Sequence, residues 1–118
     1  GTAIWGAYDE PIQLARVVHN LEHGGIYILY GSKVKDPVVA QLRAFYNDHE
    51  NGTVLAPYPK LGNQIALGAW NLLDDGTEKA YLAKCKKFDE DAYSNFFSAF
   101  QFKGPERFPS DSLLPGQN

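Results

Sequence analysis

A strand, a helix and a second strand follow one another between residues 26 and 56, and this pattern constrains the fold more than any other stretch. Residues 26–30 are apolar at every position, which is typical of a strand buried on both faces. Asp36 and Pro37 mark the start of a helix over residues 36–47, because Asp accepts free backbone N–H groups and Pro suits the first helical turn. Residues 53–56 form the second strand. A helix between two strands predicts a parallel crossover.

The remaining elements are read from periodicity and turn signals. Apolar residues at helical spacing predict a short helix over residues 12–23, and Gly24 is suited to end it because glycine adopts positive φ at low cost. Residues 64–72 predict a longer strand, in which Gly68 marks a bulge or a close backbone approach. Asp75-Gly76 is a hairpin turn signal, so residues 80–85 are expected to return as an antiparallel strand, although their Lys and Ala content also allows a helix. The expected apolar stripe of the first helix comprises Leu14, Val17, Val18 and Leu21.

A final helix is predicted from Asp89, which caps its start, to the stop at Gly104-Pro105. Its expected buried stripe consists of Ala92, Phe96 and Phe100, with Tyr93 and Phe97 beside it. These elements define an α+β fold: a small mixed β-sheet, built from a strand-helix-strand crossover and a β-hairpin, with helices packed on it. Residues 1–118 form one domain, in which residues 1–11 are an extended arm and residues 107–118 a surface tail.

The side chains best suited to metal binding or catalysis lie in one stretch, His19-x-x-Glu22-His23. If these residues form one helical turn, the two imidazoles share a face, about 5–6 Å apart at Cβ, and both can bind one metal ion. The same pattern occurs in zinc hydrolases, in which the Glu activates a metal-bound water. Alternatively, the two histidines only cap the helix or pack in the core, and Glu22 orients one ring. A metal site needs a third ligand, and the sequence does not choose among Glu78, Glu90 and Glu106.

Composition narrows the choice of metal and partner. The chain has no Met and one Cys, so a thioether or thiolate cage for copper(I) is not available, and imidazole and oxygen must supply the ligands. Cys85 is expected to be an ordinary thiol, and His49 a solvated loop residue. A net charge of −3 argues against nucleic-acid binding. No run of residues approaches the ~20 apolar positions of a membrane span.

Several motifs, in order along the chain, resemble the bacterial family known as domain of unknown function 3105. They are Trp5-Gly6-Ala7-Tyr8-Asp9, Val18-His19-Asn20-Leu21-Glu22-His23-Gly24-Gly25, Tyr30, Ala56-Pro57, Ala69-Trp70, Phe88-Asp89 and Gly104-Pro105-Glu106. The resemblance implies an extracytoplasmic location, with the protein periplasmic, secreted or membrane-anchored. It also implies a Ser-Gly-Pro-His-like element upstream of the Trp-Gly motif, whose histidine would be a natural third ligand.

The sequence thus predicts an extracytoplasmic metal-binding domain that holds copper or zinc through His19, His23 and Glu22. A zinc-dependent hydrolase with Glu22 as general base is the first alternative. A structural or partner-binding module that holds no metal is the second. A homo-oligomer in which another chain donates a ligand also stays open.

Overall fold

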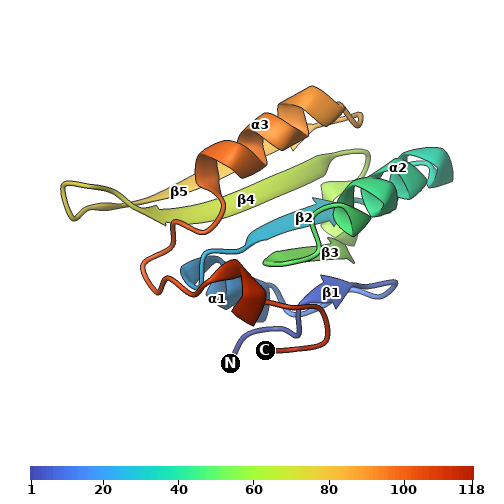
Figure 1. The fold of residues 1–118 in the computed structure, drawn as a ribbon. Helices are drawn as coiled ribbons and strands as arrows, with labels where there is room; N and C mark the ends of the chain where they lie inside the picture. The colour runs from blue at the N-terminus through green and yellow to red at the C-terminus, as the bar shows by residue number, and fades with distance from the viewer.

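The computed structural model describes residues 1–118 as a five-stranded mixed sheet with helices on both faces (Figure 1). The α+β class predicted from the sequence is confirmed. The elements in chain order are β1 (Gly6–Ala7), α1 (Leu14–Glu22), β2 (Ile26–Tyr30), α2 (Asp36–Asn47), β3 (Thr53–Pro57), β4 (Ile65–Leu72), β5 (Glu78–Cys85) and α3 (Glu90–Phe100), with short 3₁₀ turns η1 (Pro59–Leu61) and η2 (Ser110–Ser112).

The strands lie in the order β1-β3-β2-β4-β5. β2 and β3 pair in parallel across the α2 crossover, and β4 and β5 form the predicted antiparallel hairpin. Gly76 has φ +84° in the turn of that hairpin, which explains the glycine there. One strand was not expected: Gly6 and Ala7, in the predicted extended arm, pair in parallel with Val54 and Leu55. A strand of two residues is too short to show periodicity in the sequence. Its pairing is therefore defined only by the neighbouring strand β3.

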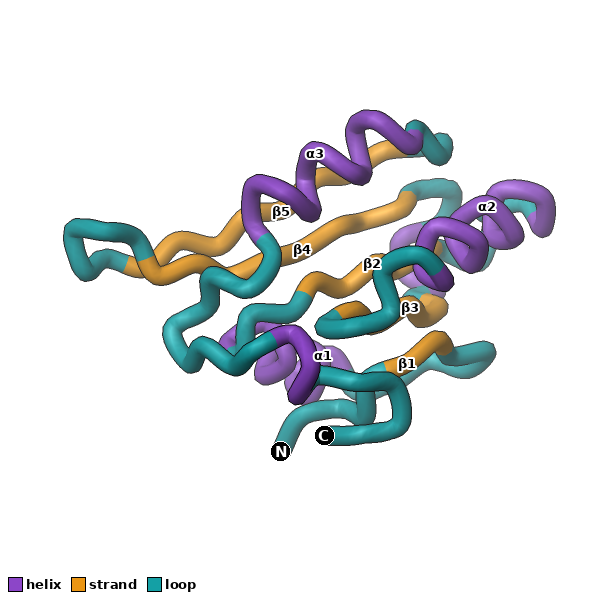
Figure 2. Tube along the Cα trace, viewed as in Figure 1, coloured by secondary structure: helices purple, strands orange, loops and turns teal.

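Two hydrophobic clusters lie on opposite faces of the sheet. The larger packs α2 and α3 against one face, and the smaller packs α1 and residues from both chain termini against the other (Figures 1 and 2). The smaller cluster comprises Ala3, Trp5, Val17, Val54 and Leu113. Most of the predicted surface tail is exposed, but Leu113 is only 3% exposed, and its carbonyl accepts a hydrogen bond from the Gly52 N–H (2.8 Å). The tail therefore closes a core that begins at the N-terminus.

Two predicted apolar stripes are corrected by the structure. Of the predicted stripe in α1 only Val17 and Leu21 are buried, whereas Leu14 and Val18 stay more than one-third exposed, and the third buried residue of the helix is Asn20. In α3 the buried residues are Tyr93 and Phe97. Ala92 is exposed there, and Phe96 and Phe100 are half-buried against the larger cluster. Each helix lies rotated from its predicted orientation, because periodicity gives the width of an apolar face but not which side of it meets the sheet.

Gly68 illustrates a close approach rather than a bulge. The pairing of β4 with β5 is continuous through this residue, opposite Leu82. Across the other edge of β4 it faces Tyr27 of β2, and a Cβ atom on Gly68 would lie 2.3 Å from the Tyr27 ring. The strand therefore needs glycine to make room for this tyrosine. None of the helices is both long enough and apolar enough to span a lipid bilayer.

Candidate metal site at the end of helix α1

His19 and His23 lie on one face at the C-terminal end of α1. Their ring centroids are 4.9 Å apart with an interplanar angle of 86°, and both side chains are half-buried. Gly24 directly follows the capping residue His23 with φ +96°, so the helix ends where the sequence predicted. The predicted sharing of one face by the two imidazoles is confirmed.

A third side chain reaches this pair from the other end of the chain. After α3 the backbone returns to the end of α1, where the Glu106 N–H donates to the Glu22 carbonyl (2.9 Å) and the Phe102 N–H donates to the Gly24 carbonyl (2.6 Å). These bonds hold Glu106 so that its Oε2 lies 3.1 Å from His23 Nε2. Glu106 is therefore fixed against α1 through its own backbone, and its side chain is half-exposed.

Gly104 makes this close approach sterically feasible. A Cβ atom on this residue would lie 2.4 Å from the Glu22 carbonyl oxygen and 2.7 Å from the Gly24 nitrogen. Both are backbone atoms at the end of α1 and cannot move aside without disturbing the helix. Glycine at position 104 therefore lets the returning chain lie directly on the helix terminus, two residues before Glu106.

The three side chains lie close enough together that they could hold a metal ion. One donor atom from each of His19, His23 and Glu106 lies within 4.8 Å of the other two. A tetrahedral ion with ligands about 2.1 Å away separates neighbouring ligand atoms by about 3.4 Å, so small side-chain rotations would close the cluster around an ion. The C-terminal end of a helix carries partial negative charge, and the Glu106 carboxylate adds to it. The electrostatics therefore favour a cation.

Comparison with known proteins gives a family and no reaction. The family model described as "Protein of unknown function (DUF3105)" matches residues 2–112. The chain belongs to the DUF3105 family. The resemblance expected from the sequence is thereby confirmed over nearly the whole chain. Neither the curated proteins nor the solved structures contain a match.

In this DUF3105 domain Glu22 lies beside the cluster but outside it. The carboxylate of Glu22 makes no hydrogen bond or ion pair, and only its backbone carbonyl supports Glu106. Its predicted roles as ligand or general base remain predictions, and the contacts give them no support. Of the three candidate third ligands, the fold brings Glu106 to the histidines, whereas Glu78 begins β5 and Glu90 begins α3. Glu106 belongs to the Gly104-Pro105-Glu106 motif, which is part of the family resemblance. This motif was the signal in the sequence that could have singled out Glu106 as the third ligand.

Phe108 forms one wall of the cluster. Its ring centroid lies 4.5 Å from that of His23, and 40% of the residue remains exposed. Glu106 and Phe108 therefore contact His23 from the same short segment. An apolar ring beside a metal ligand lowers the local dielectric constant and strengthens the attraction between an ion and its carboxylate ligand.

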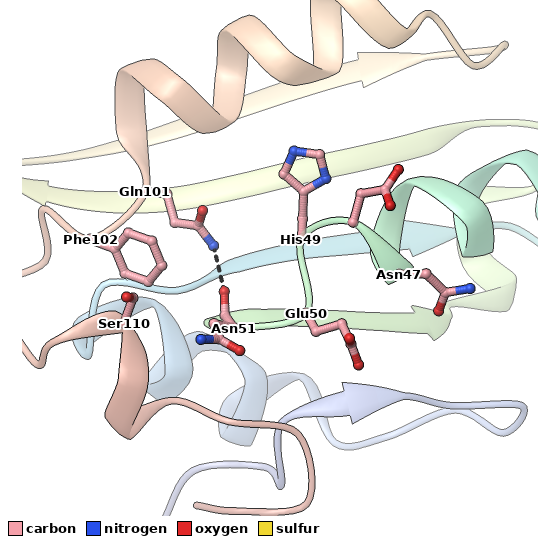
Figure 3. Close-up of a pocket in the computed structure, with 8 residues that line it drawn as sticks. Asn47, His49, Glu50, Asn51, Gln101, Phe102 and Ser110 are labelled. Carbon is pink, nitrogen blue, oxygen red and sulfur yellow. Dashed lines mark hydrogen bonds between the residues drawn. The ribbon is translucent and has the colours of Figure 1, made fainter.

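His49, the third histidine, lies elsewhere, in the loop between α2 and β3 as expected, but it is half-buried and packed rather than freely solvated. Its ring stacks on Phe45 with centroids 4.0 Å apart, and its Nδ1 hydrogen-bonds to the Phe45 carbonyl (2.8 Å). It lines an open, polar hollow of about 390 Å³ between the α2–β3 loop and the end of α3. Figure 3 shows Gln101 reaching from α3 to bond the Asn51 carbonyl (3.0 Å) on the other side of this hollow. The hollow shares no residue with the cluster of His19, His23 and Glu106.

Cys85 sits in a structural hydrogen-bond network. Its Sγ lies 3.0 Å from the Tyr93 hydroxyl, which in turn donates to the Lys87 carbonyl (3.1 Å). Burial, together with the bond to Cys85, raises the pKa of the Tyr93 phenol far above its ordinary value. Both side chains tie the end of β5 to α3.

Proposed function

We propose that this domain binds one divalent transition-metal ion, zinc or copper(II), through His19, His23 and Glu106. The observation that carries the proposal is the meeting of three potential ligands, two imidazoles and one carboxylate, from opposite ends of the chain within 4.8 Å. The two histidines are a local pair on one helix. The carboxylate arrives only because the backbone of residues 102–106 is fastened to the end of that helix.

The chemistry of the ligands supports this choice of metals. Two imidazoles and one carboxylate suit zinc and copper(II), whereas magnesium and calcium prefer all-oxygen sites. Copper(I) prefers thiolate and thioether ligands, which the cluster does not contain. Three protein ligands leave a coordination position for water or for a group from a partner. We also propose that the domain is located outside the cytoplasm, where copper-binding proteins are common. This part of the proposal derives from the family resemblance.

Calorimetric titration of the purified domain with zinc and with copper(II) tests the site. We expect one ion per chain, and we expect His19→Ala, His23→Ala and Glu106→Gln each to weaken binding at least about tenfold, since even groups that only support a ligand contribute about 10–100-fold. Glu22→Gln is the matched control, because it removes a neighbouring carboxylate outside the cluster. If none of the three cluster substitutions weakens binding, or if Glu22→Gln has the larger effect, the assignment is wrong.

The location can be tested separately. Fractionation of the native host, probed with an antibody against this domain, is expected to place the protein outside the cytoplasm. Recovery in the cytoplasmic fraction would contradict that part of the proposal and leave the metal site unaffected.

A further inference from the structure

Strand β5 presents a long unpaired edge. It is the last strand of the sheet, and its eight residues pair only with β4. No other segment of the chain bonds to the backbone N–H and C=O groups along its outer side. Leu82, near the middle of this strand, is 57% exposed, more than any other large apolar residue. Such an edge is a template for pairing with another strand.

Charge is unevenly distributed along this hairpin. Acidic residues occur at the start of β5 and in the turn before it: Asp74, Asp75 and Glu78. Three lysines occur at its end and just beyond: Lys84, Lys86 and Lys87. A fourth, Lys79, follows Glu78 but lies over the Tyr81 ring, on the opposite face of the strand from Glu78 and Lys84. Two identical edges related by a two-fold axis must run antiparallel, so the acidic end of one copy meets the basic end of the other. A head-to-tail parallel arrangement would place like charges together.

We propose that β5 pairs antiparallel with β5 of a second copy of this chain and joins the two sheets. In the register we propose, Glu78 faces Lys84 of the partner subunit and Ala80 faces Leu82 of the partner subunit, so residues 78–84 of both copies are paired. Tyr81 and Cys85 contact α3 residues on the inner face of the sheet, which places Glu78, Leu82 and Lys84 together on the outer face. The interface then forms two Glu–Lys pairs and covers the exposed leucine.

Sedimentation equilibrium over a concentration series, with EDTA present to exclude association through metal ions, tests this inference. We expect a reversible dimer that weakens at high ionic strength. Glu78→Lys and Lys84→Glu should each weaken it about tenfold, since the two-fold axis applies every reversal twice and turns attraction into repulsion. The double variant Glu78→Lys/Lys84→Glu should restore dimerisation. Lys60→Glu, on the η1 turn, makes the same charge change as Lys84→Glu and should have no effect.

The rescue by the double variant is the decisive result. All of these positions are exposed, so the variants should keep the wild-type far-UV circular dichroism spectrum. A protein that stays monomeric throughout the series overturns the proposal. A dimer that is insensitive to both single reversals places the interface elsewhere. Rescue of Glu78→Lys by Lys86→Glu instead of Lys84→Glu overturns the proposed register, because that pair would face each other only after a shift of the strands.

Discussion

Cleavage by trypsin after Arg107 should report whether Glu106 holds a metal ion. Arg107 is exposed and directly follows Glu106 in the segment that lies on α1. For the protease to bind the peptide bond after Arg107, the segment must leave the helix. This movement breaks the hydrogen bond from the Glu106 N–H to the Glu22 carbonyl and separates the Glu106 carboxylate from His23. An ion bound to all three side chains opposes this opening, so zinc should slow cleavage.

The size of the effect follows from linkage. When the segment opens, the ion loses Glu106 and keeps the two histidines. The factor by which saturating zinc slows cleavage therefore equals the zinc affinity of the complete site divided by the zinc affinity of the site without Glu106. Calorimetry of Glu106→Gln measures the same ratio independently. We expect it to be at least about tenfold. At a free zinc concentration 100 times Kd the ceiling is about 100-fold, equivalent to about 2.7 kcal/mol.

Mass spectrometry of timed digests gives the rate at each bond, under conditions in which opening and closing are faster than cleavage. Cleavage after Lys86 and Lys87, in the connection between β5 and α3, is the internal control and should not depend on zinc. Glu106→Gln should lose the protection after Arg107. If calorimetry shows tight binding while cleavage after Arg107 proceeds at the same rate with and without zinc, Glu106 is not a ligand.

Three further predictions concern stability and are measured by urea denaturation. Gly104→Ala should destabilise the fold by about 1–3 kcal/mol, because the added methyl group meets backbone atoms of α1, and it should also weaken zinc binding. Leu113→Ala should cost about 2–5 kcal/mol because this tail residue is buried, whereas Leu82→Ala, at a position exposed in the monomer, should change stability by less than about 0.5 kcal/mol at protein concentrations too low for the proposed dimer. Equal effects of the two would refute the role given to the tail. Above pH ~10 the protein should lose stability: the folded state keeps Tyr93 neutral by raising its pKa, so the unfolded chain loses this proton first. Tyr93→Phe should reduce this alkaline loss; a loss as steep as in the wild-type protein would contradict this account.

The sequence was sufficient for most of the fold because the relevant signals are local. The apolar run of β2, the Asp-Pro start of α2 and the Asp-Gly turn of the hairpin each depend on residues a few positions apart, and each was found where predicted. The predicted capping role of Asp36 is wrong, because Lys35 is the N-cap residue of α2 and no side chain makes a capping hydrogen bond there. The features that were not predicted depend on contacts between distant parts of the chain. Gly6 and Ala7 became a strand only because β3 offered a free edge, and α1 and α3 present different residues to the core than periodicity suggested.

The candidate site also has a part that local sequence predicts and a part that depends on the tertiary structure. By itself the sequence determined the histidine pair, since a spacing of four residues on a helix places two side chains on one face whatever surrounds them. It also determined that the helix stops just before Gly24, whose positive φ is a backbone conformation that glycine adopts easily.

Only the tertiary structure decided the identity of the third group. Glu22 and Glu106 are both carboxylates, and Glu22 is the neighbour of His23 in the sequence. Successive residues on a helix point about 100° apart, so adjacency along the chain does not bring Glu22 toward the ring of His23. Glu106 reaches that ring because Gly104 allows two backbone segments, distant in sequence, to come into direct contact.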